Sequence, residues 1–329
     1  MNEPLLQVKD LRTYFYTEEG VIPSVDGISF DLTQGETLAI VGESGCGKSV
    51  TSLSIMRLVD CPPGKIESGE IIYQGEDLLK KSEKEMRAIR GNDISMIFQE
   101  PMTSLNPVFT VGSQIAESFR IHQGMKKHDA RTHAIEMIQM VGISSPEKVV
   151  DQYPHELSGG MRQRIMIAMA LACKPKILIA DEPTTALDVT IQAQIMHLLA
   201  DLKKQTGTSI IIITHDLGVV AQIAENAMVM YAGQVVEYAS VSKIYKDPLH
   251  PYTDGLLKSI PNLSDDVERL YNIKGMVPCA SEYPTGCRFC PRCECASEIC
   301  EQKEPPLLAL ADGRSVRCWK YMQEGQSNE

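Results

Sequence analysis

The chain has 329 residues and a formal net charge of −11, with 43% hydrophobic and 23% charged residues. That length suffices for one large or two modest domains, and the composition is ordinary for a globular protein. The acidic balance argues against nucleic-acid binding, which normally uses a basic face. No apolar run is long enough for a membrane helix, and the first residues lack a signal-peptide pattern, so we expect a cytosolic chain.

The stretch ETLAIVGESGCGKSVTSLSIMRLV predicts an apolar strand, a glycine-rich turn and a helix. The turn matches G-x-x-x-x-G-K-[ST]. Its glycines allow successive N–H groups to point inward as an anion nest. Lys48 can then reach the β- and γ-phosphates, and the Ser49 hydroxyl can coordinate Mg²⁺. The sequence therefore predicts a nucleotide loop made of Gly42, Glu43, Ser44, Gly45, Cys46, Gly47, Lys48 and Ser49.

The cysteine inside this loop, Cys46, has two neighbours that lower the pKa of a thiol. One is the N-terminus of the predicted helix and the other is Lys48. We therefore expect maleimide to label Cys46 in the nucleotide-free protein and Mg-ATP to protect it. The alternative interpretation is a buried and inert small residue.

A helical insertion is predicted after the loop, because Lys48 and Asp181 lie 133 residues apart. Neighbouring strands joined by one crossover helix would be much closer in sequence. The segment from about 101 to 174 is mostly helical by pattern, as in DARTHAIEMIQMVGI. Near its end, Ser158, Gly159 and Gly160 open a long helix, whose free N–H groups and dipole predict a second phosphate site. Two such helix starts in one chain indicate that two chains meet head to tail.

Two further apolar strands are predicted, each followed by polar residues. Ile177 to Ala180 form the first, and Asp181 at its carboxyl end is placed to hold Mg²⁺. Glu182 follows directly, so its carboxylate can polarise the attacking water. The second strand, TSIIIIT, ends at His215, which can contact a γ-phosphate or serve a structural role.

Seven of the ten cysteines lie between positions 279 and 318, five of them in GCRFCPRCECASEIC. Disulfides are rare in the cytosol, so metal or iron–sulfur ligation is the leading interpretation. Cys287, Cys290 and Cys293 form a ferredoxin-like C-x2-C-x2-C run, and tetrathiolate zinc is another alternative. The segment is short and poor in apolar runs, so a metal centre would supply the cross-links that it lacks.

These motifs together resemble the nucleotide-binding subunits of ABC transporters. The matching stretches are GESGCGKS, FQEPMTSLNP, LSGGMRQR, ILIADEP, ALDVTIQAQI, THD and MYAGQVVE. EPMTSLNP, PLHPYT and the cysteine-rich tail narrow the resemblance to the ATPases of bacterial dipeptide and oligopeptide importers and the related nickel importers. It implies an α/β P-loop ABC ATPase with a mixed sheet core, an antiparallel β subdomain and an inserted helical subdomain. The ATPase domain would span 1–245, with its helical subdomain at about 101–174. An extension at 246–329 would carry the cysteine-rich segment at about 276–320.

The resemblance implies roles for single residues in the ATP site. Gln99 would sense Mg²⁺ and the γ-phosphate, and with Ser49 and Asp181 it completes the predicted Mg²⁺ set. Glu182 would be the catalytic base and His215 the switch histidine. The signature residues Ser158, Gly159 and Gly160 would bind the partner's nucleotide in trans, with Asp188 at the dimer interface. EPMTSLNP would receive the permease.

Two more assignments come from the resemblance. Phe15 aligns best with the aromatic that stacks on adenine, with Tyr14 and Tyr16 as competitors.

Some importers hold a [4Fe–4S] cluster at a Gly-Cys-x-Phe-x-x-Arg-Cys-x6-Cys-x17-Cys pattern. That pattern falls here on Cys287, Cys293, Cys300 and Cys318, with Phe289 and Arg292 also matching. The implied role is structural, with redox sensing as the alternative.

The implied function is an ATPase that binds and hydrolyses ATP with Mg²⁺ to power uptake of dipeptides or oligopeptides. The alternative is a nickel or metal-chelate importer of the same family. Expected partners are a second ABC ATPase subunit, which would be a paralogue, two permease subunits and an external substrate-binding protein, with no nucleic acid. The expected location is the cytoplasmic face of the bacterial inner membrane. Other classes fit less well, because the chain has one nucleotide domain and no long coiled-coil insertion.

Overall fold

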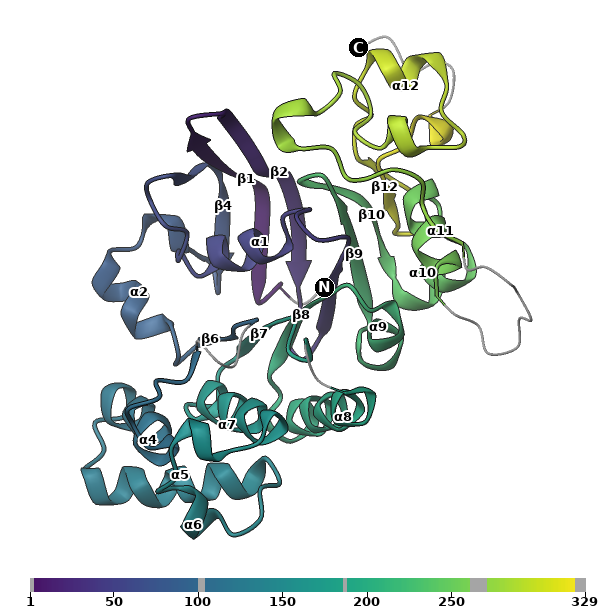
Figure 1. Cartoon of the computed structure of the whole chain (residues 1–329). Helices are drawn as coiled ribbons and strands as arrows, with labels where there is room; N and C mark the ends of the chain where they lie inside the picture. Colours follow the sequence, from purple (N-terminus) through teal and green to yellow (C-terminus); the bar gives the residue numbers. More distant parts are fainter. Residues whose placement is uncertain (1–2, 100–103, 186–187, 261–270, 323–329) are drawn as a thin grey trace. The chain divides into compact units, whose positions relative to one another are not determined.

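The computed structural model describes residues 3–99, 104–185, 188–260 and 271–322 (Figure 1). The chain divides into two compact units. The first consists of Met1–Glu3, Thr33–Glu36 and Lys80–Ile213, and the second of Pro4–Leu32, Thr37–Leu79 and Thr214–Glu329. The two units therefore interleave along the sequence.

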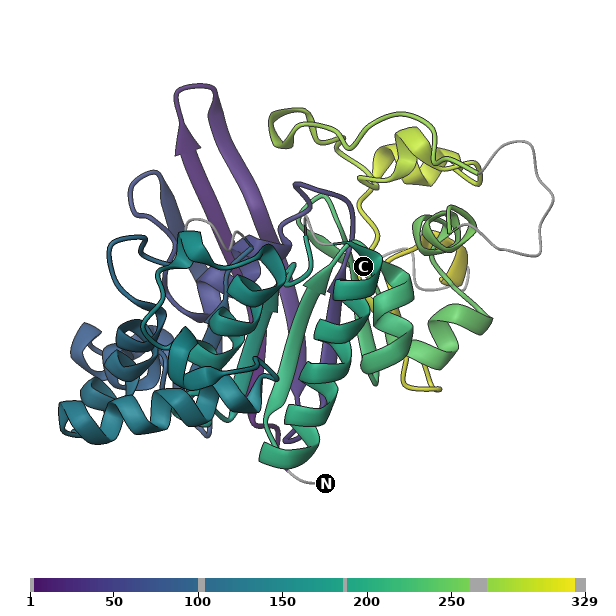
Figure 2. The same ribbon diagram turned by 60° about the horizontal axis from the view of Figure 1, so that its bottom comes forward.

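The second unit contains an antiparallel sheet with the strand order β2-β1-β4-β5. Its strands are β1 (Leu6–Thr17), β2 (Gly20–Leu32), β4 (Gly64–Tyr73) and β5 (Glu76–Asp77). β1 and β2 form a long hairpin in which Thr17 pairs with Gly20 (Figure 2). Val8 and Leu11 of β1 are both buried, and an irregular register with Asp10 at φ 42° separates them. This bulge keeps Leu11 on the buried face, since strict alternation would turn it outward.

A second set of strands in this unit includes the predicted apolar strand before the glycine-rich turn. All five residues of that strand, β3 (Thr37–Val41), are buried, which is typical of a strand covered on both faces. It pairs in parallel with β9 (Asn226–Tyr231), and β9 forms a hairpin with β10 (Gln234–Ser240) through Ala232 and Gly233 at φ 48° and 82°. Positive φ at both turn residues suits a tight hairpin. The strands in spatial order are β11 (Leu308–Ala309), β12 (Ser315–Val316), β10 (Gln234–Ser240), β9 (Asn226–Tyr231) and β3 (Thr37–Val41).

The C-terminal extension is attached to this sheet at two points. β12 pairs with β10, so residues near the C-terminus return to the sheet that contains β3. Glu237 of β10 is fully buried, and its carboxylate accepts hydrogen bonds from the backbone N–H groups of Leu249 (2.9 Å) and His250 (2.8 Å). His250 in turn caps the next helix by accepting the N–H of Tyr252 (3.1 Å). Burial lowers the pKa of His250 to about 3, so its ring stays neutral and can accept this bond.

The helices of the second unit are short. They are α1 (Lys48–Ile55), α9 (Leu217–Ile223), α10 (Val241–Lys246), α11 (Pro251–Lys258) and α12 (Glu298–Gln302). Single 3₁₀ turns of this unit are η3 (Ala280–Glu282), η4 (Cys290–Arg292) and η5 (Trp319–Tyr321), and η1 (Leu78–Lys80) lies where the sequence passes to the first unit. The cysteine-rich segment thus has little regular structure of its own.

The first unit combines three parallel strands with a group of helices. β7 (Ile177–Asp181) lies between β6 (Ile94–Ile97) and β8 (Ser209–Thr214), and every residue of β7 and β8 is buried. The predicted strands before Asp181 and His215 are therefore confirmed. Continuous apolar runs of this length form buried parallel strands because both faces are covered.

The predicted helical insertion is also confirmed, since helices fill the sequence between β6 and β7. α4, α5 and α7 lie side by side in both views (Figures 1 and 2). The helices of this unit are α2 (Glu83–Ile89), α4 (Val111–His122), α5 (Lys127–Met140), α6 (Pro146–Val149), α7 (Gly159–Leu171) and α8 (Val189–Thr206), with the 3₁₀ turn η2 (Pro154–Glu156). Across the described ranges, no helix is both long and apolar enough to cross a membrane.

Candidate functional site

The glycine-rich turn connects β3 to α1 in the second unit. Gly42, Gly45 and Gly47 have φ values of 157°, 80° and 101°, which glycine adopts readily and other residues rarely do. A Cβ atom on Gly42 would lie 2.2 Å from the carbonyl oxygen of Met230, and one on Gly47 would lie 2.1 Å from that of Ser24. Both positions therefore exclude a side chain, and the backbone has the curl that an anion nest requires.

The ammonium group of Lys48 lies within this turn. Its side chain is buried, and Nζ donates hydrogen bonds to the carbonyl oxygens of Gly42 (2.8 Å) and Glu43 (3.0 Å). The N–H and the hydroxyl of Thr51 both donate to the Gly47 carbonyl at 2.9 Å, which holds the start of α1 against the turn. A cation and a helix N-terminus at one turn favour phosphate binding.

Cys46 differs from the sequence-based expectation. Its side chain is fully buried, and burial raises the pKa of its thiol although Lys48 Nζ lies 4.0 Å from Sγ. The structure therefore favours the inert alternative over the reactive thiol, because desolvation of the thiolate outweighs the nearby positive charge. The buried, inert alternative agrees with the structure.

We expect maleimide to label Cys46 slowly, and at the same rate with and without Mg-ATP, because the thiol is protonated and shielded. The exposed Cys61 of the same unit is an internal reference and should label rapidly. Peptide mass mapping after timed labelling gives both rates in one sample. Labelling of Cys46 as fast as Cys61, with protection by Mg-ATP, would restore the reactive interpretation.

The three aromatic candidates for adenine stacking lie next to one another on β1. The Tyr14 hydroxyl donates to Asp26 (2.8 Å) and the Tyr16 hydroxyl to Glu67 (2.5 Å). Phe15 is half-buried and has no polar group to be engaged in this way. Stacking on a base is worth about 1–3 kcal/mol in comparable settings. The role of Phe15 stays a prediction.

The acidic pair lies at the end of β7 in the first unit. Asp181 is buried, and Glu182 has φ 45°, a costly conformation for a residue other than glycine. Glu182 Oε2 accepts hydrogen bonds from Gln99 Nε2 (3.0 Å) and the Thr185 hydroxyl (2.8 Å), and its N–H donates to the Ile213 carbonyl (2.9 Å). The structure thus joins two predicted catalytic residues, Gln99 and Glu182, although 83 positions separate them.

The predicted signature residues form the start of α7. Ser158 is the N-cap of this helix, and Gly159 and Gly160 are its first two residues. A Cβ atom on Gly160 would lie 3.2 Å from the Ile191 side chain on the first turn of α8. Asp188 caps α8 by accepting the Ile191 N–H (2.9 Å). The starts of the two helices are therefore neighbours, and both have a polar cap.

The remaining predicted residues are less constrained by the structure. His215 is exposed directly after β8, in the part of the chain that belongs to the second unit. The next residue, Asp216, caps α9. Residues 100–103, which belong to the expected permease-binding EPMTSLNP, and residues 186–187 of ALDV lie outside the described residues. The functional roles of all these side chains stay predictions.

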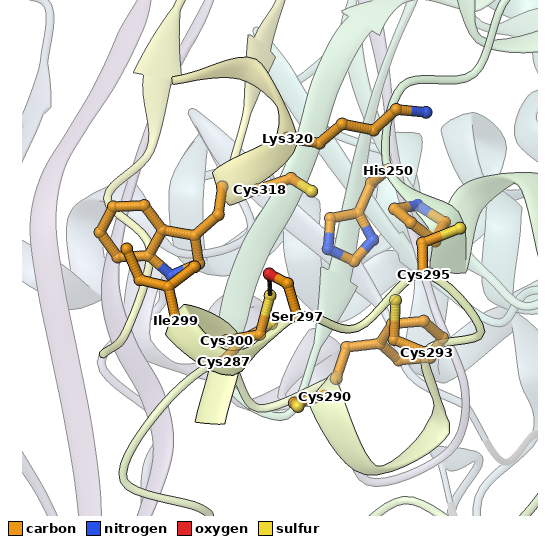
Figure 3. Close-up of a pocket in the computed structure, with 13 residues that line it drawn as sticks. His250, Cys287, Cys290, Cys293, Cys295, Ser297, Ile299, Cys300, Cys318 and Lys320 are labelled. Atoms are coloured by element: carbon orange, nitrogen blue, oxygen red, sulfur yellow. Dashed lines mark hydrogen bonds between the residues drawn. The ribbon is translucent and has the colours of Figure 1, made fainter. Parts of the chain in front are cut away.

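Six cysteines line one cavity of about 290 Å³ in the second unit (Figure 3). They are Cys287, Cys290, Cys293, Cys295, Cys300 and Cys318. His250, Phe289 and Trp319 also contribute to its wall. Thiols from the turns around η4, from α12 and from the residue before η5 are thus brought together.

Burial governs the electrostatics of this cavity. It raises the pKa of Cys287 and of Cys293 to about 11, and it also raises the pKa of Cys290 and of Cys318. Such thiols stay protonated near neutral pH unless a bound cation replaces the proton. Among the described residues, no three His, Cys, Asp or Glu side chains are grouped so that they could hold one metal ion.

Two contacts to Glu43 in the nucleotide loop escaped the sequence analysis. The Tyr252 hydroxyl accepts the Glu43 N–H at 2.9 Å. The Arg292 guanidinium donates to both carboxylate oxygens of Glu43, at 2.6 and 3.0 Å. Tyr252 belongs to the motif PLHPYT, and Arg292 belongs to the cysteine pattern. The sequence analysis noted both motifs, but their spacing could not indicate that either residue contacts Glu43.

The comparison with protein families agrees with this architecture. Residues 25–185 match the family model described as ABC transporter. The chain belongs to the ATP-binding proteins of ABC transporters and is an ABC-type ATPase. Residues 236–300 match a second model, described as Oligopeptide/dipeptide transporter, C-terminal region.

Within that family, the chain is similar over nearly its full length to named peptide transport proteins. It is 56% identical to the oligopeptide transport ATP-binding protein AppD of Bacillus subtilis, covering 98% of both chains. It is 54% identical to the oligopeptide transport ATP-binding protein OppD of the same species, covering 96% of this chain and 88% of the relative.

Solved structures confirm the predicted ABC ATPase fold. The dimeric post-hydrolysis state of the ATP-binding cassette MJ0796 bound to ADP and Pi has a TM-score of 0.65 at 28% identity, covering 72% of this chain and 98% of the other. CbiO1 of Clostridium perfringens has a TM-score of 0.63 at 27% identity, covering 75% and 92%.

Proposed function

We propose that the chain is the ATPase subunit that powers uptake of dipeptides or oligopeptides through a membrane ABC importer. The match of residues 236–300 to the C-terminal region of oligopeptide and dipeptide transporters carries this proposal. Relatives named as oligopeptide transport ATP-binding proteins support it. Residues 1–245 would then form the ATPase domain, and 246–329 the extension with the cysteine-rich segment at about 276–320.

The ATP site would use the residues that the motifs assign. Lys48 and the amides of the nucleotide loop bind the phosphates, and Ser49, Asp181 and Gln99 serve Mg²⁺. Glu182 orients the attacking water. Its hydrogen bond from Gln99 supports a shared task, because both side chains are then positioned together. Catalysis of this kind is mostly positional and electrostatic.

Assembly would complete the site. Ser158, Gly159 and Gly160 bind the nucleotide of a second ATPase subunit, which is a paralogue, with Asp188 at that interface. The dimeric state of the MJ0796 cassette supports this arrangement. His215 contacts the γ-phosphate, and Phe15 stacks on adenine. Two permease subunits and an external substrate-binding protein complete the importer, and this subunit binds peripherally at the cytoplasmic face of the inner membrane.

The cysteine-rich segment would hold a [4Fe–4S] cluster through Cys287, Cys293, Cys300 and Cys318. The donor chemistry fits, because these four thiols line one cavity of about 290 Å³. Four thiolates are the usual ligand set of such a cluster. When bound, the cluster supplies cross-links to a segment that has little regular structure.

Zinc is the alternative to a cluster. A tetrathiolate zinc site needs four sulfurs at about 2.3 Å from one ion, and metal analysis of the purified protein distinguishes the two. Cys290 is the rival ligand to Cys318. In Figure 3 the sulfur of Cys290 lies at the lower edge of the group and is directed away from Cys318, which favours the set that includes Cys318.

The function is tested with the whole transporter in proteoliposomes, in which the partner ATPase carries an inactivating substitution. We expect peptide-loaded binding protein to stimulate ATP hydrolysis, and Lys48→Ala to lower hydrolysis by at least about 10²-fold, because the phosphates lose a preorganised cation. Lys246→Ala removes an exposed lysine of the same unit and should leave hydrolysis unchanged. Stimulation by Ni²⁺ but by no peptide would contradict the proposed substrate.

A further inference from the structure

Arg292 joins the cysteine-rich segment to the nucleotide loop. It lies at the end of η4, between Cys290 and Cys293, which both line the cysteine cavity. Its side chain is only 4% exposed. Nη1 and Nη2 donate to the two carboxylate oxygens of Glu43 at 2.6 and 3.0 Å, and Nε donates to the carbonyl oxygen of Lys274 at 2.9 Å. Such a two-pronged bond fixes both the position and the orientation of the carboxylate.

The backbone of Glu43 is held by the same part of the chain. Its N–H donates to the hydroxyl of Tyr252, a fully buried side chain on α11. The Tyr252 ring packs at 4.8 Å from the Tyr231 ring and 5.4 Å from the Phe289 ring, measured between centroids. The Arg292 guanidinium lies 5.7 Å from the Tyr231 centroid. The backbone N–H of Glu43 is thus bonded to a tyrosine of this aromatic cluster, and its carboxylate is bonded to an arginine that packs on the same cluster.

Arg288, on the other side of Phe289, supports the loop by a second route. Its Nη1 donates to the Ala232 carbonyl at 2.6 Å, and its Nη2 binds Asp26. Gly233, the next residue of that hairpin turn, donates its N–H to the Cys46 carbonyl at 3.1 Å. The stretch Arg288–Arg292 therefore holds the nucleotide loop at Glu43 directly and at Cys46 through the turn between β9 and β10.

We propose that Arg292 is a positioning residue for the nucleotide loop. Through Glu43 it holds the loop in its phosphate-binding form, so that the affinity for ATP depends on a cysteine-rich segment 249 positions further along the chain. Glu43 is itself partly exposed, so the main effect of losing Arg292 is the loss of both hydrogen bonds that hold its carboxylate, and a loop that is no longer preorganised binds its ligand more weakly. The inference rests on the proposed function of the loop in binding ATP.

The experiment measures ATP hydrolysis against ATP concentration in the assembled transporter. We expect Arg292→Gln to raise the KM for ATP by at least about tenfold, because the Glu43 charge loses its buried partner. The kcat should stay close to the wild-type value, since the residues that act on water are untouched. Arg292→Lys keeps the charge but loses the planar fork, so its KM should be intermediate.

The matched control is Arg314→Gln. The Arg314 side chain is half-buried, and its guanidinium binds Asp247 (3.0 Å) and Asp312 (2.7 Å) rather than Glu43. This variant should keep the wild-type KM. Iron content is measured for each protein, because unchanged iron in Arg292→Gln separates loss of loop positioning from loss of the whole segment.

Glu43→Gln tests the same contact from the loop and leaves the cysteine-rich segment unaltered. It should raise the KM, and the double variant with Arg292→Gln should raise it little further, because both changes remove one interaction. A wild-type KM in Glu43→Gln, or in Arg292→Gln that retains iron, overturns the inference. Wild-type ATP binding by Lys48→Ala would instead refute the proposed function of the loop.

Discussion

Replacement of Glu182 by glutamine should stop most ATP hydrolysis in the assembled transporter while ATP still binds. A positioned general base contributes about 10²–10⁴-fold to a rate, and we expect a loss in that range. Glutamine has the shape of glutamate and can still accept from Gln99 and Thr185, whose bonds to Oε2 measure 3.0 and 2.8 Å. It lacks the negative charge that polarises the attacking water.

Two measurements separate the outcomes for Glu182→Gln. Equilibrium binding should give a near-normal affinity for ATP, and phosphate release should be lost when the partner ATPase is also inactive. The control is Glu136→Gln, an exposed residue on α5 whose carboxylate binds His133 at 2.8 Å. It should hydrolyse ATP normally. Near-normal phosphate release by Glu182→Gln would contradict the assignment of Glu182 as the catalytic base.

The Cys318→Ser variant should lose the iron–sulfur cluster, whereas Cys295→Ser should retain it. Both thiols line the same cavity, but only Cys318 belongs to the proposed ligand set. Iron–sulfur clusters select soft thiolate ligands, which a serine hydroxyl does not replace. Protein purified without oxygen should be brown and contain about four irons and four sulfides per chain. Iron and sulfide analysis with absorption spectroscopy measures the loss.

Two other results would change the assignment of the cysteines. Stoichiometric zinc without iron in anaerobic protein would exclude the cluster and leave a cysteine framework around another metal. Loss of iron in Cys290→Ser, with retention in Cys318→Ser, would favour the ferredoxin-like set of Cys287, Cys290 and Cys293. The Cys295→Ser protein serves as the control in both cases, because the exposed Cys295 belongs to neither set.

Much of the ATP site follows from local patterns. β3, β7 and β8 are short strands rich in apolar residues, and all their residues are buried, so their positions could be predicted from hydrophobicity. The helix that begins after Ser158 could be predicted in the same way, because a serine before two glycines is a good N-cap. Each of these features depends on residues a few positions apart.

Cys46 shows where local reasoning fails. Its sequence neighbours, Lys48 and the start of α1, both lower the pKa of a thiol. The structure raises the pKa instead, because the side chain is fully buried. A Cβ atom on Gly42 would lie 2.6 Å from its sulfur, which shows how closely the loop packs around it. Burial depends on the whole fold, so the order of the residues could not indicate the sign of this shift.

The sequence by itself determined the class of ATPase, the extent of its apolar strands and the identity of its phosphate-binding turn, because those properties reside in short motifs with fixed spacing. Only the tertiary structure decided which distant side chains meet. The fold brings Gln99 within hydrogen-bond distance of Glu182, places six cysteines around one cavity and pairs Arg292 with Glu43. Such contacts depend on how strands and turns from remote parts of the chain pack together. The spacing of motifs could not show that Arg292 contacts Glu43, which lies 249 positions away in the sequence.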